Sequence, residues 1–392
     1  MKDIYIAAST RTPLGSFQGV FSSMSAPQLG AIAIESTIDN AALKTNLIDE
    51  VYFGNVVSAG LGQAPARQAA LDAGLQTSTP CTTVSKVCGS GMKAVMLAAD
   101  AIQCGHIDIA VAGGMESMSN APYLLEKARS GHRLGHASTR DSLFVDGLED
   151  ARTGRLMGIF GQQTADDYEF DRETLDDYAL ESLRRAQEAT DKAYFADEIT
   201  TVTVSNRKGD IEVSQDEQVL HAKPEKIRKL KPAFKQDGTV TAANSSSMSD
   251  GAASMLVLSK QGLEKSGLKA QARICGYVSH AQKPEEFTIA PVGAINKLLN
   301  VTGWQKDQVD LFEINEAFAV VALHAIKQLE LDHYKVNIHG GACAIGHPLG
   351  ASGARIIVTL IHALKRLGKS KGIASLCIGG GEATAIAIEL VS

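Results

Sequence analysis

A chain of 392 residues, of which 44% are hydrophobic and 21% charged, has enough apolar material for the core of two or three domains and does not have the composition of a disordered protein. Its formal net charge of −6 argues against nucleic acid as the main partner. The six cysteines form no C-x-x-C pair, which excludes zinc-ribbon and thioredoxin-like sites and favours reduced thiols in a cytoplasmic protein. The first residues lack the pattern of a signal peptide, and no apolar run is long enough to span a membrane.

Short apolar segments alternate with amphipathic helical patterns along the chain. Strands are expected at residues 3–9, 50–57, 108–114, 254–259, 310–315 and 373–381. Helices, in which apolar residues recur at i, i+3, i+4 and i+7, are expected at residues 93–105, 174–190, 317–329 and 354–368. This alternation predicts an α/β protein whose parallel sheets are covered by helices on both faces.

Residues 119–247 differ from this pattern because they are charged and interrupted by Gly and Pro. We expect them to leave the sheet and to form helices and loops of their own. The segment contains a basic cluster that could meet phosphate groups, although a solvated helix face explains it equally well. The members of this cluster are Lys223, Lys226, Arg228, Lys229 and Lys231.

Three pairs of segments indicate an internal repeat. Residues 87–92 (VCGSGM) resemble residues 349–354 (LGASGA) at an offset of 262. Residues 48–55 match residues 309–316 in hydrophobic pattern at an offset of 261. Matches in one order and at one spacing predict two copies of the same α/β unit, whose corresponding loops meet at one cleft.

The third pair lies in the same order at a slightly larger offset. Residues 110–117 (AVAGGMES) match residues 377–384 (CIGGGEAT) at an offset of 267. This match requires a five-residue insertion in the second copy, which we expect near the segment GKSKG.

Cys88, in the segment KVCGSGMKAV, lies at the expected start of a helix. The partial positive charge of a helix N-terminus favours a thiolate, and a nearby histidine can take the proton. The competing interpretation is a small buried residue at a close-packed turn, which is the commoner role of a cysteine. Asn315, His347 and Cys377 also lie at expected strand–helix junctions, and each of them alone has an ordinary structural interpretation.

Four segments taken together carry a resemblance to a known family. They are SKVCGSGMKA with Cys88, INEAFA with Asn315, GGACAIGHPLGASGAR with His347, and CIGGGEATA with Cys377. In this order and spacing the chain resembles the thiolase family over nearly its whole length, and within it the short-chain type that acts on acetoacetyl-CoA, the acetyl-CoA acetyltransferases.

The resemblance implies a fold and a division into domains. The expected architecture is the α/β thiolase fold, a duplicated five-layer αβαβα arrangement with an inserted loop domain. Residues 1–118 with 248–268 would form the N-terminal half, residues 119–247 the inserted loop domain that binds coenzyme A and makes oligomer contacts, and residues 269–392 the C-terminal half.

The resemblance also implies roles for five catalytic residues. Cys88 would be the nucleophile that carries the acyl group, and His347 would activate it. Cys377 would be the base that removes the Cα proton of acetyl-CoA and returns it in the reverse direction. His347 and a water molecule held by Asn315 would bind the enolate oxygen, and the backbone N–H groups of Cys88 and Gly379 would bind the oxyanion of the acyl-enzyme. Neither a metal nor a redox cofactor is needed, because coenzyme A is a substrate and product.

Six further residues are candidates for binding the substrate. Met157, Phe234, Ser246 and Phe318 match family positions that line the pantetheine and acyl site, although Met and Phe at such places are equally compatible with a core. From the basic cluster we select Lys223 and Arg228 for the phosphates of coenzyme A.

The chain departs from the family pattern on the substrate side. A commonly occurring arginine that faces the adenine end of coenzyme A is Leu220 here. Bulky Phe160 and Ile289 stand where the family often has smaller residues, so we expect a reshaped or smaller acyl pocket. We expect structural roles for Arg355 and Cys343.

Three other functions have partial support in the sequence. GSGMKA at 89–94 fits the dinucleotide fingerprint G-x-G-x-x-A, but Asp108 is a weak ribose partner and Cys88 would be unexplained, which argues against a dehydrogenase. A non-catalytic relative would be expected to have lost one of the four catalytic residues. The closest competitor is a degradative 3-ketoacyl-CoA thiolase with the same mechanism and longer substrates.

The expected partners are acetyl-CoA, acetoacetyl-CoA and coenzyme A, with no nucleic acid and no membrane. The expected assembly is a homodimer or homotetramer.

Overall fold

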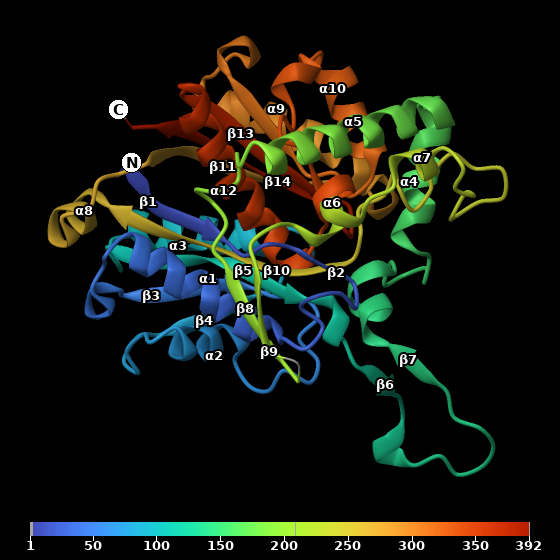
Figure 1. Ribbon diagram of the computed structural model, residues 1–392, viewed down its shortest axis with the longest axis horizontal. Helices are drawn as coiled ribbons and strands as arrows, with labels where there is room; N and C mark the ends of the chain where they lie inside the picture. Colours follow the sequence, from blue (N-terminus) through green and yellow to red (C-terminus); the bar gives the residue numbers. More distant parts are fainter. Residues whose placement is uncertain (1–2, 208, 392) are drawn as a thin grey trace.

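Two halves of a long sheet meet where β1 (Ile4–Arg11) pairs with β11 (Ala272–Ala281) in the computed structural model, which describes residues 3–207 and 209–391 (Figure 1). The pairing is antiparallel and places Ile4 opposite Ile274. The strands of both halves therefore follow one path of hydrogen-bonded neighbours, β12-β13-β14-β11-β1-β10-β5-β3-β4.

The two halves of this path have similar strand orders. The N-terminal half adds to β1 the strands β10 (Ser249–Ser259), β5 (Ile109–Ser117), β3 (Glu50–Gly54) and β4 (Cys81–Val84), with the short β2 (Gly15–Ser16) beside β10. The C-terminal half adds to β11 the strands β14 (Glu382–Leu390), β13 (Lys371–Ile378) and β12 (Leu311–Ile314).

The prediction of parallel sheets is only partly correct. Pairing is parallel within β4-β3-β5 and within β12-β13, but β1, β10, β11 and β14 pair antiparallel with their neighbours. Antiparallel neighbours need no crossover helix. β13 and β14 are an example, because they are joined by a tight turn in which Gly380 and Gly381 have φ of 94° and 90°. The expected strand 373–381 therefore ends at Ile378.

Helices form three layers around the two sheet halves. α3 (Ser90–Gln103) and α12 (Leu349–Leu367) pack on each other in the middle, and α12 contacts both halves. α1 (Ala26–Asn40) and α2 (Pro65–Asp72) cover the outer face of the N-terminal half, and α9 (Ala290–Thr302) with α10 (Ala319–Leu329) lies outside the C-terminal half (Figure 1). This arrangement confirms the expected five-layer αβαβα fold.

The side chains of β10 show how one strand serves two layers. Met255 and Val257 belong to the apolar cluster around α3 and α12, whereas Leu256 and Leu258 belong to the cluster beneath α1 and α2. Successive side chains of a strand point to opposite faces, so a strand buried on both faces is apolar throughout. This explains why the sequence of β10 shows no alternation.

The contact between α3 and α12 supports the repeat. A Cβ atom on Gly91 would lie 2.9 Å from the Ala354 nitrogen, and a Cβ on Gly353 would lie 2.5 Å from the Met92 nitrogen. These two contacts are related by the offset of 262 that the sequence suggests. Glycine is required at both places because the two helix backbones approach so closely.

The third segment pair was matched in the wrong register. Glu50 on β3 pairs with Ala110 on β5, and Leu311 on β12 pairs with Gly372 on β13. Residue 110 therefore corresponds to residue 372, an offset of 262 with no insertion. The glycines that suggested the match differ physically, since Gly113 is an interior strand residue and Gly380 lies in a turn.

The chain between β5 and β10 carries elements of its own. Most of it lies at one side of the sheet, and the hairpin of β6 and β7 extends away from the body (Figure 1). The elements are β6 (Tyr123–Leu125), β7 (Thr139–Asp141), the π-helical turn η4 (Phe144–Leu148), α4 (Met157–Asp167), α5 (Arg172–Asp191), β8 (Val202–Asn206), β9 (Gly209–Val213), α6 (Glu217–His221) and α7 (Pro224–Ile227).

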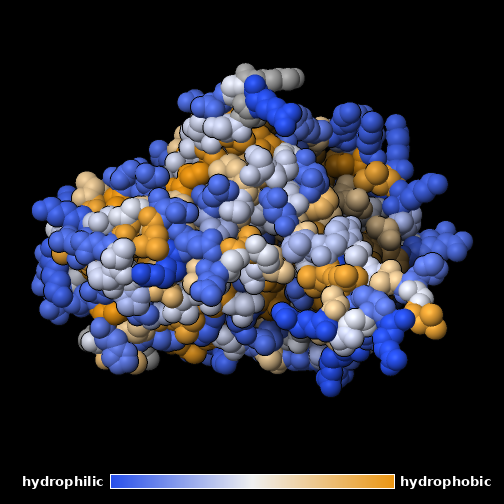
Figure 2. Space-filling view, turned by 90° about the horizontal axis from the view of Figure 1, so that it is seen from below, coloured by the Kyte–Doolittle hydropathy of each residue, from blue (hydrophilic) through white to orange (hydrophobic). Residues whose placement is uncertain are grey.

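Shorter elements complete the fold. They are α8 (Lys260–Ser266), α11 (Ala342–Ile345) and the 3-10 turns η1 (Thr45–Leu47), η2 (Met118–Asn120), η3 (Ala128–Ser130), η5 (Pro284–Ile289), η6 (Lys306–Gln308) and η7 (His333–Lys335). The face shown in Figure 2 is mostly hydrophilic, with small separate hydrophobic areas. Within residues 3–207 and 209–391, none of the helices has both the length and the apolar character needed to cross a bilayer.

Candidate active site

Cys88 lies on a tight turn between β4 and α3. The N–H of Gly89 donates to the Lys86 carbonyl at 3.0 Å, and the Ser90 hydroxyl accepts from the Lys86 N–H at 2.8 Å. Val87 takes a left-handed conformation with φ of 45°, which is unfavourable for a β-branched residue. Such strain is maintained only where the surrounding structure imposes it, and here it sets the direction of Cys88.

The Cys88 turn packs against the end of β13. A Cβ atom on Gly89 would lie 2.4 Å from Ile378 Cδ1. The backbone N–H groups of Gly379 and of Cys88 itself lie near the Cys88 sulfur and lower the pKa of its thiol. Two backbone donors are therefore available beside this sulfur.

Burial keeps Cys88 a thiol in the free protein. The side chain is 8% exposed, and desolvation raises the pKa of the thiol to about 11, assisted by the charge of Glu116 and opposed by the two backbone donors. The stabilisation of the thiolate that we expected from the helix N-terminus is therefore smaller than the cost of burial. Desolvation raises the free energy of the charged sulfur by more than the two N–H groups lower it. Cys88 needs a proton acceptor to become a nucleophile.

Cys377 lies on β13 and is fully buried. Burial raises the pKa of its thiol well above the usual range, and the charge of Cys88 raises it further. The two sulfurs are thus close enough to influence each other, and the site disfavours ionising both at once.

His347 lies just before α12 and is 5% exposed. Its backbone N–H donates to the Ser247 carbonyl at 3.0 Å, and its Nδ1 lies 2.6 Å from the Ser352 hydroxyl. Burial, with the charge of Arg355 as a second cause, lowers the pKa of the ring to about 3. The ring is therefore neutral at physiological pH and can accept a proton. The described residues include no hydrogen bond from this ring to either Cys88 or Cys377.

Asn315, which follows β12, is held beside this ring. Its backbone N–H donates to the Ser375 carbonyl at 3.0 Å, and its side-chain Nδ2 lies 3.4 Å from Nδ1 and 3.5 Å from Nε2 of His347. Its Oδ1 accepts a hydrogen bond from Arg355 at 3.3 Å. No sequence pattern predicts this contact, since the sequence indicates only a structural role for Arg355.

Comparison with known proteins shows which family this arrangement belongs to. Residues 4–261 match the family model of the thiolase N-terminal domain, and residues 268–390 match that of the thiolase C-terminal domain. The chain belongs to the thiolase family.

Individual thiolases are similar over the whole chain. Acetyl-CoA acetyltransferase 1 of Arabidopsis thaliana is 48% identical over 394 residues, which cover 100% of this chain and 95% of the relative. A thiolase from Ascaris suum, solved in complex with coenzyme A, is 43% identical with a TM-score of 0.94 and 100% of both chains covered. Human mitochondrial 3-ketoacyl-CoA thiolase is 35% identical with a TM-score of 0.96, covering 100% of this chain and 99% of the human chain.

Of the apolar residues predicted for the substrate side of this thiolase, Met157 lies next to Gly379. A Cβ on Gly379 would lie 3.4 Å from Met157 Sδ, and the rings of Phe234 and Phe318 meet edge to face with centroids 6.2 Å apart. Ser246 lies beside them, since its N–H donates to the carbonyl of Ala317 at 3.0 Å.

A row of aromatic rings extends from Phe318. Phe287 packs against Phe318 at 6.5 Å and against Phe160 at 6.4 Å, measured between ring centroids. Phe160, Phe287 and Phe318 share one apolar cluster with Cys377. Phe160 and Cys377 of this thiolase therefore belong to one continuous apolar core.

Lys223 and Arg228 lie apart from these residues, around α7. Lys223 lines a cavity of about 310 Å³ together with Lys226, Ala243 and others, while Arg228 forms an exposed ion pair with Asp177. The contacts described for residues 3–207 and 209–391 do not connect either side chain with Cys88 or His347.

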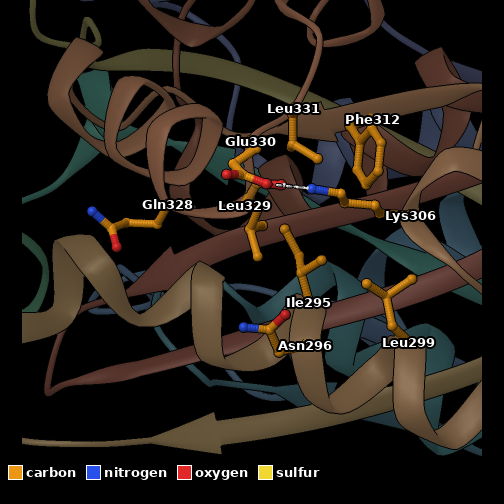
Figure 3. A pocket seen from close by; sticks show the side chains of 9 residues that line it. All are labelled: Ile295, Asn296, Leu299, Lys306, Phe312, Gln328, Leu329, Glu330 and Leu331. Atoms are coloured by element: carbon orange, nitrogen blue, oxygen red, sulfur yellow. Dashed lines mark hydrogen bonds and ion pairs between the residues drawn. The ribbon is translucent and has the colours of Figure 1, made fainter.

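A separate cavity of about 190 Å³ lies between α9, β12 and the end of α10 (Figure 3). Lys306 and Glu330 form an ion pair of 2.9 Å at its edge, above the side chains of Ile295 and Leu299. Neither the cysteines nor His347 of the thiolase site contribute to its lining.

Proposed function

We propose that this thiolase is an acetyl-CoA C-acetyltransferase that joins two acetyl-CoA molecules into acetoacetyl-CoA and catalyses the reverse thiolysis through an acetyl-Cys88 intermediate. The observation that carries the proposal is the pair of buried neighbouring thiols, one of which has two backbone N–H donors at its sulfur. A neutral imidazole and an oriented amide complete the group.

In the first half-reaction Cys88 Sγ attacks the thioester carbon of acetyl-CoA and its proton passes to Nε2 of His347. The N–H groups of Cys88 and Gly379 donate to the oxygen that becomes negative. The C–S bond to coenzyme A breaks, and the leaving thiolate takes the proton of Cys377. The products are acetyl-Cys88, free coenzyme A, protonated His347 and ionised Cys377.

This state is prepared for the second half-reaction. The Cys377 thiolate removes a Cα proton from a second acetyl-CoA, and the protonated His347 donates from Nε2 to the enolate oxygen. The enolate carbon attacks the carbonyl carbon of acetyl-Cys88, and the departing Cys88 thiolate takes its proton back from His347. All protons return to their starting positions. Because the balance closes with these groups alone, we propose neither a metal nor a redox cofactor.

The substrates follow from the relatives and from the residues near Gly379. The Arabidopsis relative is named an acetyl-CoA acetyltransferase, and the Ascaris thiolase was solved with coenzyme A. We propose that Met157, Phe234, Ser246 and Phe318 contact the pantetheine and acyl groups, and that Lys223 and Arg228 meet the phosphates. Arg228 would have to leave Asp177 to do so.

A broader 3-ketoacyl-CoA thiolase is the second candidate, since the human enzyme of that name has the same fold. The ring of Phe160 supports the short-chain function, because it adds bulk to the apolar cluster that contains Cys377 and packs against Phe287.

The assembly, the cellular location and the domain boundaries are also proposals. We propose a homodimer or homotetramer, a cytoplasmic location, and the division into residues 1–118 with 248–268, 119–247 and 269–392. The elements between β5 and β10 support the inserted segment. The mitochondrial origin of the human neighbour leaves the location to be measured by fractionation.

The function is tested by the intact mass of the purified protein after brief exposure to acetyl-CoA, followed by peptide mapping. We expect one added acetyl group on the peptide that contains Cys88, removed by free coenzyme A and absent from Cys88→Ser. An unmodified protein that still binds coenzyme A would instead be a non-catalytic relative. A series of 3-ketoacyl-CoA substrates then separates the two thiolase candidates.

A further inference from the structure

Ser352 and Arg355 lie three residues apart on α12, so their side chains emerge on the same side of the helix. Both are 1% exposed. Each contacts one of the two side chains to which we assign the enolate oxygen: Ser352 contacts His347 and Arg355 contacts Asn315. One buried helix face thus supports both groups.

The hydrogen bonds of Ser352 define the form of the His347 ring. The Ser352 hydroxyl donates to the Pro348 carbonyl at 2.9 Å, as an i to i−4 bond within the helix. A hydroxyl has one proton, so towards His347 Nδ1, at 2.6 Å, its oxygen acts as an acceptor. The neutral ring therefore carries its proton on Nδ1 and presents the lone pair of Nε2.

This tautomer suits both half-reactions. A ring with a free Nε2 accepts the Cys88 proton, and once it is protonated the same Nε2 becomes the donor to the enolate oxygen. The bond from Nδ1 to Ser352 remains in place throughout. The ring changes its role without turning.

Arg355 has the corresponding effect on Asn315. A side-chain amide can be turned so that oxygen and nitrogen exchange places. The guanidinium donates to Oδ1 and can only donate, so it keeps Nδ2 on the side of His347. Glu313 lies 3.5 Å from the Arg355 guanidinium, and both side chains are buried.

We propose that Ser352 and Arg355 are positioning residues, Ser352 setting the tautomer of His347 and Arg355 the amide orientation of Asn315. This inference rests on the proposed function. The proposal predicts different effects for the two residues. Ser352 affects both half-reactions because His347 takes part in both, whereas Arg355 affects only enolate formation because Asn315 takes part only there.

The test measures the two half-reactions separately in purified variants. Acetylation of Cys88 is followed by quenched mass spectrometry, and enolate formation by uptake of deuterium from the solvent into acetyl-CoA. The variants are Ser352→Ala, Ser352→Thr, Arg355→Met, Asn315→Ala and Asn315→Ala with Arg355→Met. Thr359→Ala is the matched control, because Thr359 is another buried hydroxyl on α12 that contacts Glu198 instead of the site.

We expect Ser352→Ala to slow both half-reactions by about 10- to 100-fold, the size of effect seen when a group that orients a functional histidine through its other ring nitrogen is removed. Ser352→Thr, which keeps the hydroxyl, should recover most of the rate. Arg355→Met should slow deuterium uptake while leaving acetylation within about threefold, and it should add nothing to Asn315→Ala. Equal loss of both half-reactions in Arg355→Met, multiplicative loss in the double variant, or Ser352→Ala rates like those of Thr359→Ala would overturn the proposal.

Two further measurements keep the result decisive. If Arg355→Met fails to fold, the double variant Glu313→Gln with Arg355→Met is used in its place, because it replaces both members of the buried pair.

The ¹⁵N spectrum of His347 reports the tautomer without any turnover. We expect a protonated Nδ1 and an unprotonated Nε2 in the native protein, and a changed pattern in Ser352→Ala. The opposite tautomer in the native protein refutes the inference even if catalysis proceeds, whereas the expected tautomer without Cys88 acetylation refutes the proposed function and leaves the assignment of Ser352 standing.

Discussion

The ammonium group of Lys86 and the carboxylate of Glu382 form an ion pair that joins the turn before Cys88 to the strand that follows Gly381. The two segments supply the two N–H donors that lie near the Cys88 sulfur. The side chains of the pair are only partly exposed, at 22% and 36%. Their link therefore holds together the two halves of the proposed oxyanion site.

Breaking this ion pair should slow acetylation of Cys88 modestly. A partly exposed pair contributes up to about 1 kcal/mol, so we expect a loss of up to about fivefold for Lys86→Met or Glu382→Gln. The charge-reversed double variant Lys86→Glu with Glu382→Lys should regain activity. Added salt should slow the native protein more than either single variant. Rates that are independent of both changes would mean that the loops are held by packing alone.

The reactivity of Cys88 towards iodoacetamide should keep rising at high pH. Only the thiolate is alkylated, and burial raises the pKa of this thiol to about 11. Peptide mapping across a pH series should show a rate at Cys88 that climbs about tenfold per unit and levels off only near pH 11, while a simple thiol levels off near pH 8.5. A plateau near neutral pH would instead indicate a preformed thiolate–imidazolium pair with His347.

Acid should destabilise the native protein more than a His347→Asn variant. The pKa of the folded ring, about 3, lies below the value of about 6.5 for an unfolded histidine. Between these values the unfolded chain binds more protons, so the free energy of unfolding falls as the pH drops through 6.5. We expect the native protein to lose about 2 kcal/mol relative to His347→Asn between pH 8 and pH 5.

Denaturant titrations at several pH values measure this difference. His132→Asn, at an exposed position, is the control for the effect of removing any histidine from the chain. Parallel pH curves for the native protein and His347→Asn would show that the ring reaches water and is protonated at ordinary pH.

Replacing Phe160 by alanine should extend the range of acyl chains. The ring belongs to the apolar cluster that contains Cys377, so its removal opens space in that cluster. The ratio of kcat/KM for 3-ketohexanoyl-CoA to that for acetoacetyl-CoA should rise about tenfold, the order that one or two methylenes are worth in a pocket. Phe195→Leu, in a different part of the molecule, serves as the control for lost core volume. An unchanged ratio would place the chain-length limit elsewhere.

Much of the fold could be read from local patterns. The expected helix at 354–368 became α12 from Leu349 to Leu367, and the expected strand at 254–259 became the end of β10. The offset of 262 correctly relates Gly91 to Gly353. The third repeat match failed because residue similarity does not reveal hydrogen-bond register, which pairs Ala110 with Glu50 and Gly372 with Leu311.

By itself the sequence determined that Cys88 lies just before a helix, that the chain contains two copies of one unit, that Asn315 follows a strand and that His347 precedes a helix. These properties depend on neighbours along the chain, such as the turn residues beside Cys88 and the apolar period of α12. The expected strand–helix junction at Cys377 is wrong, because Cys377 lies inside β13 and the chain turns directly into β14. The tertiary structure alone decided that Cys88 is a thiol at rest, that His347 is neutral, and that Arg355 supports Asn315. Those properties depend on the exclusion of water and on contacts between residues far apart in sequence. Glu116, for example, accepts a hydrogen bond of 2.8 Å from the N–H of Gly350, which lies 234 residues further along the chain. Desolvation and such contacts exist only once the two halves have packed around α3 and α12.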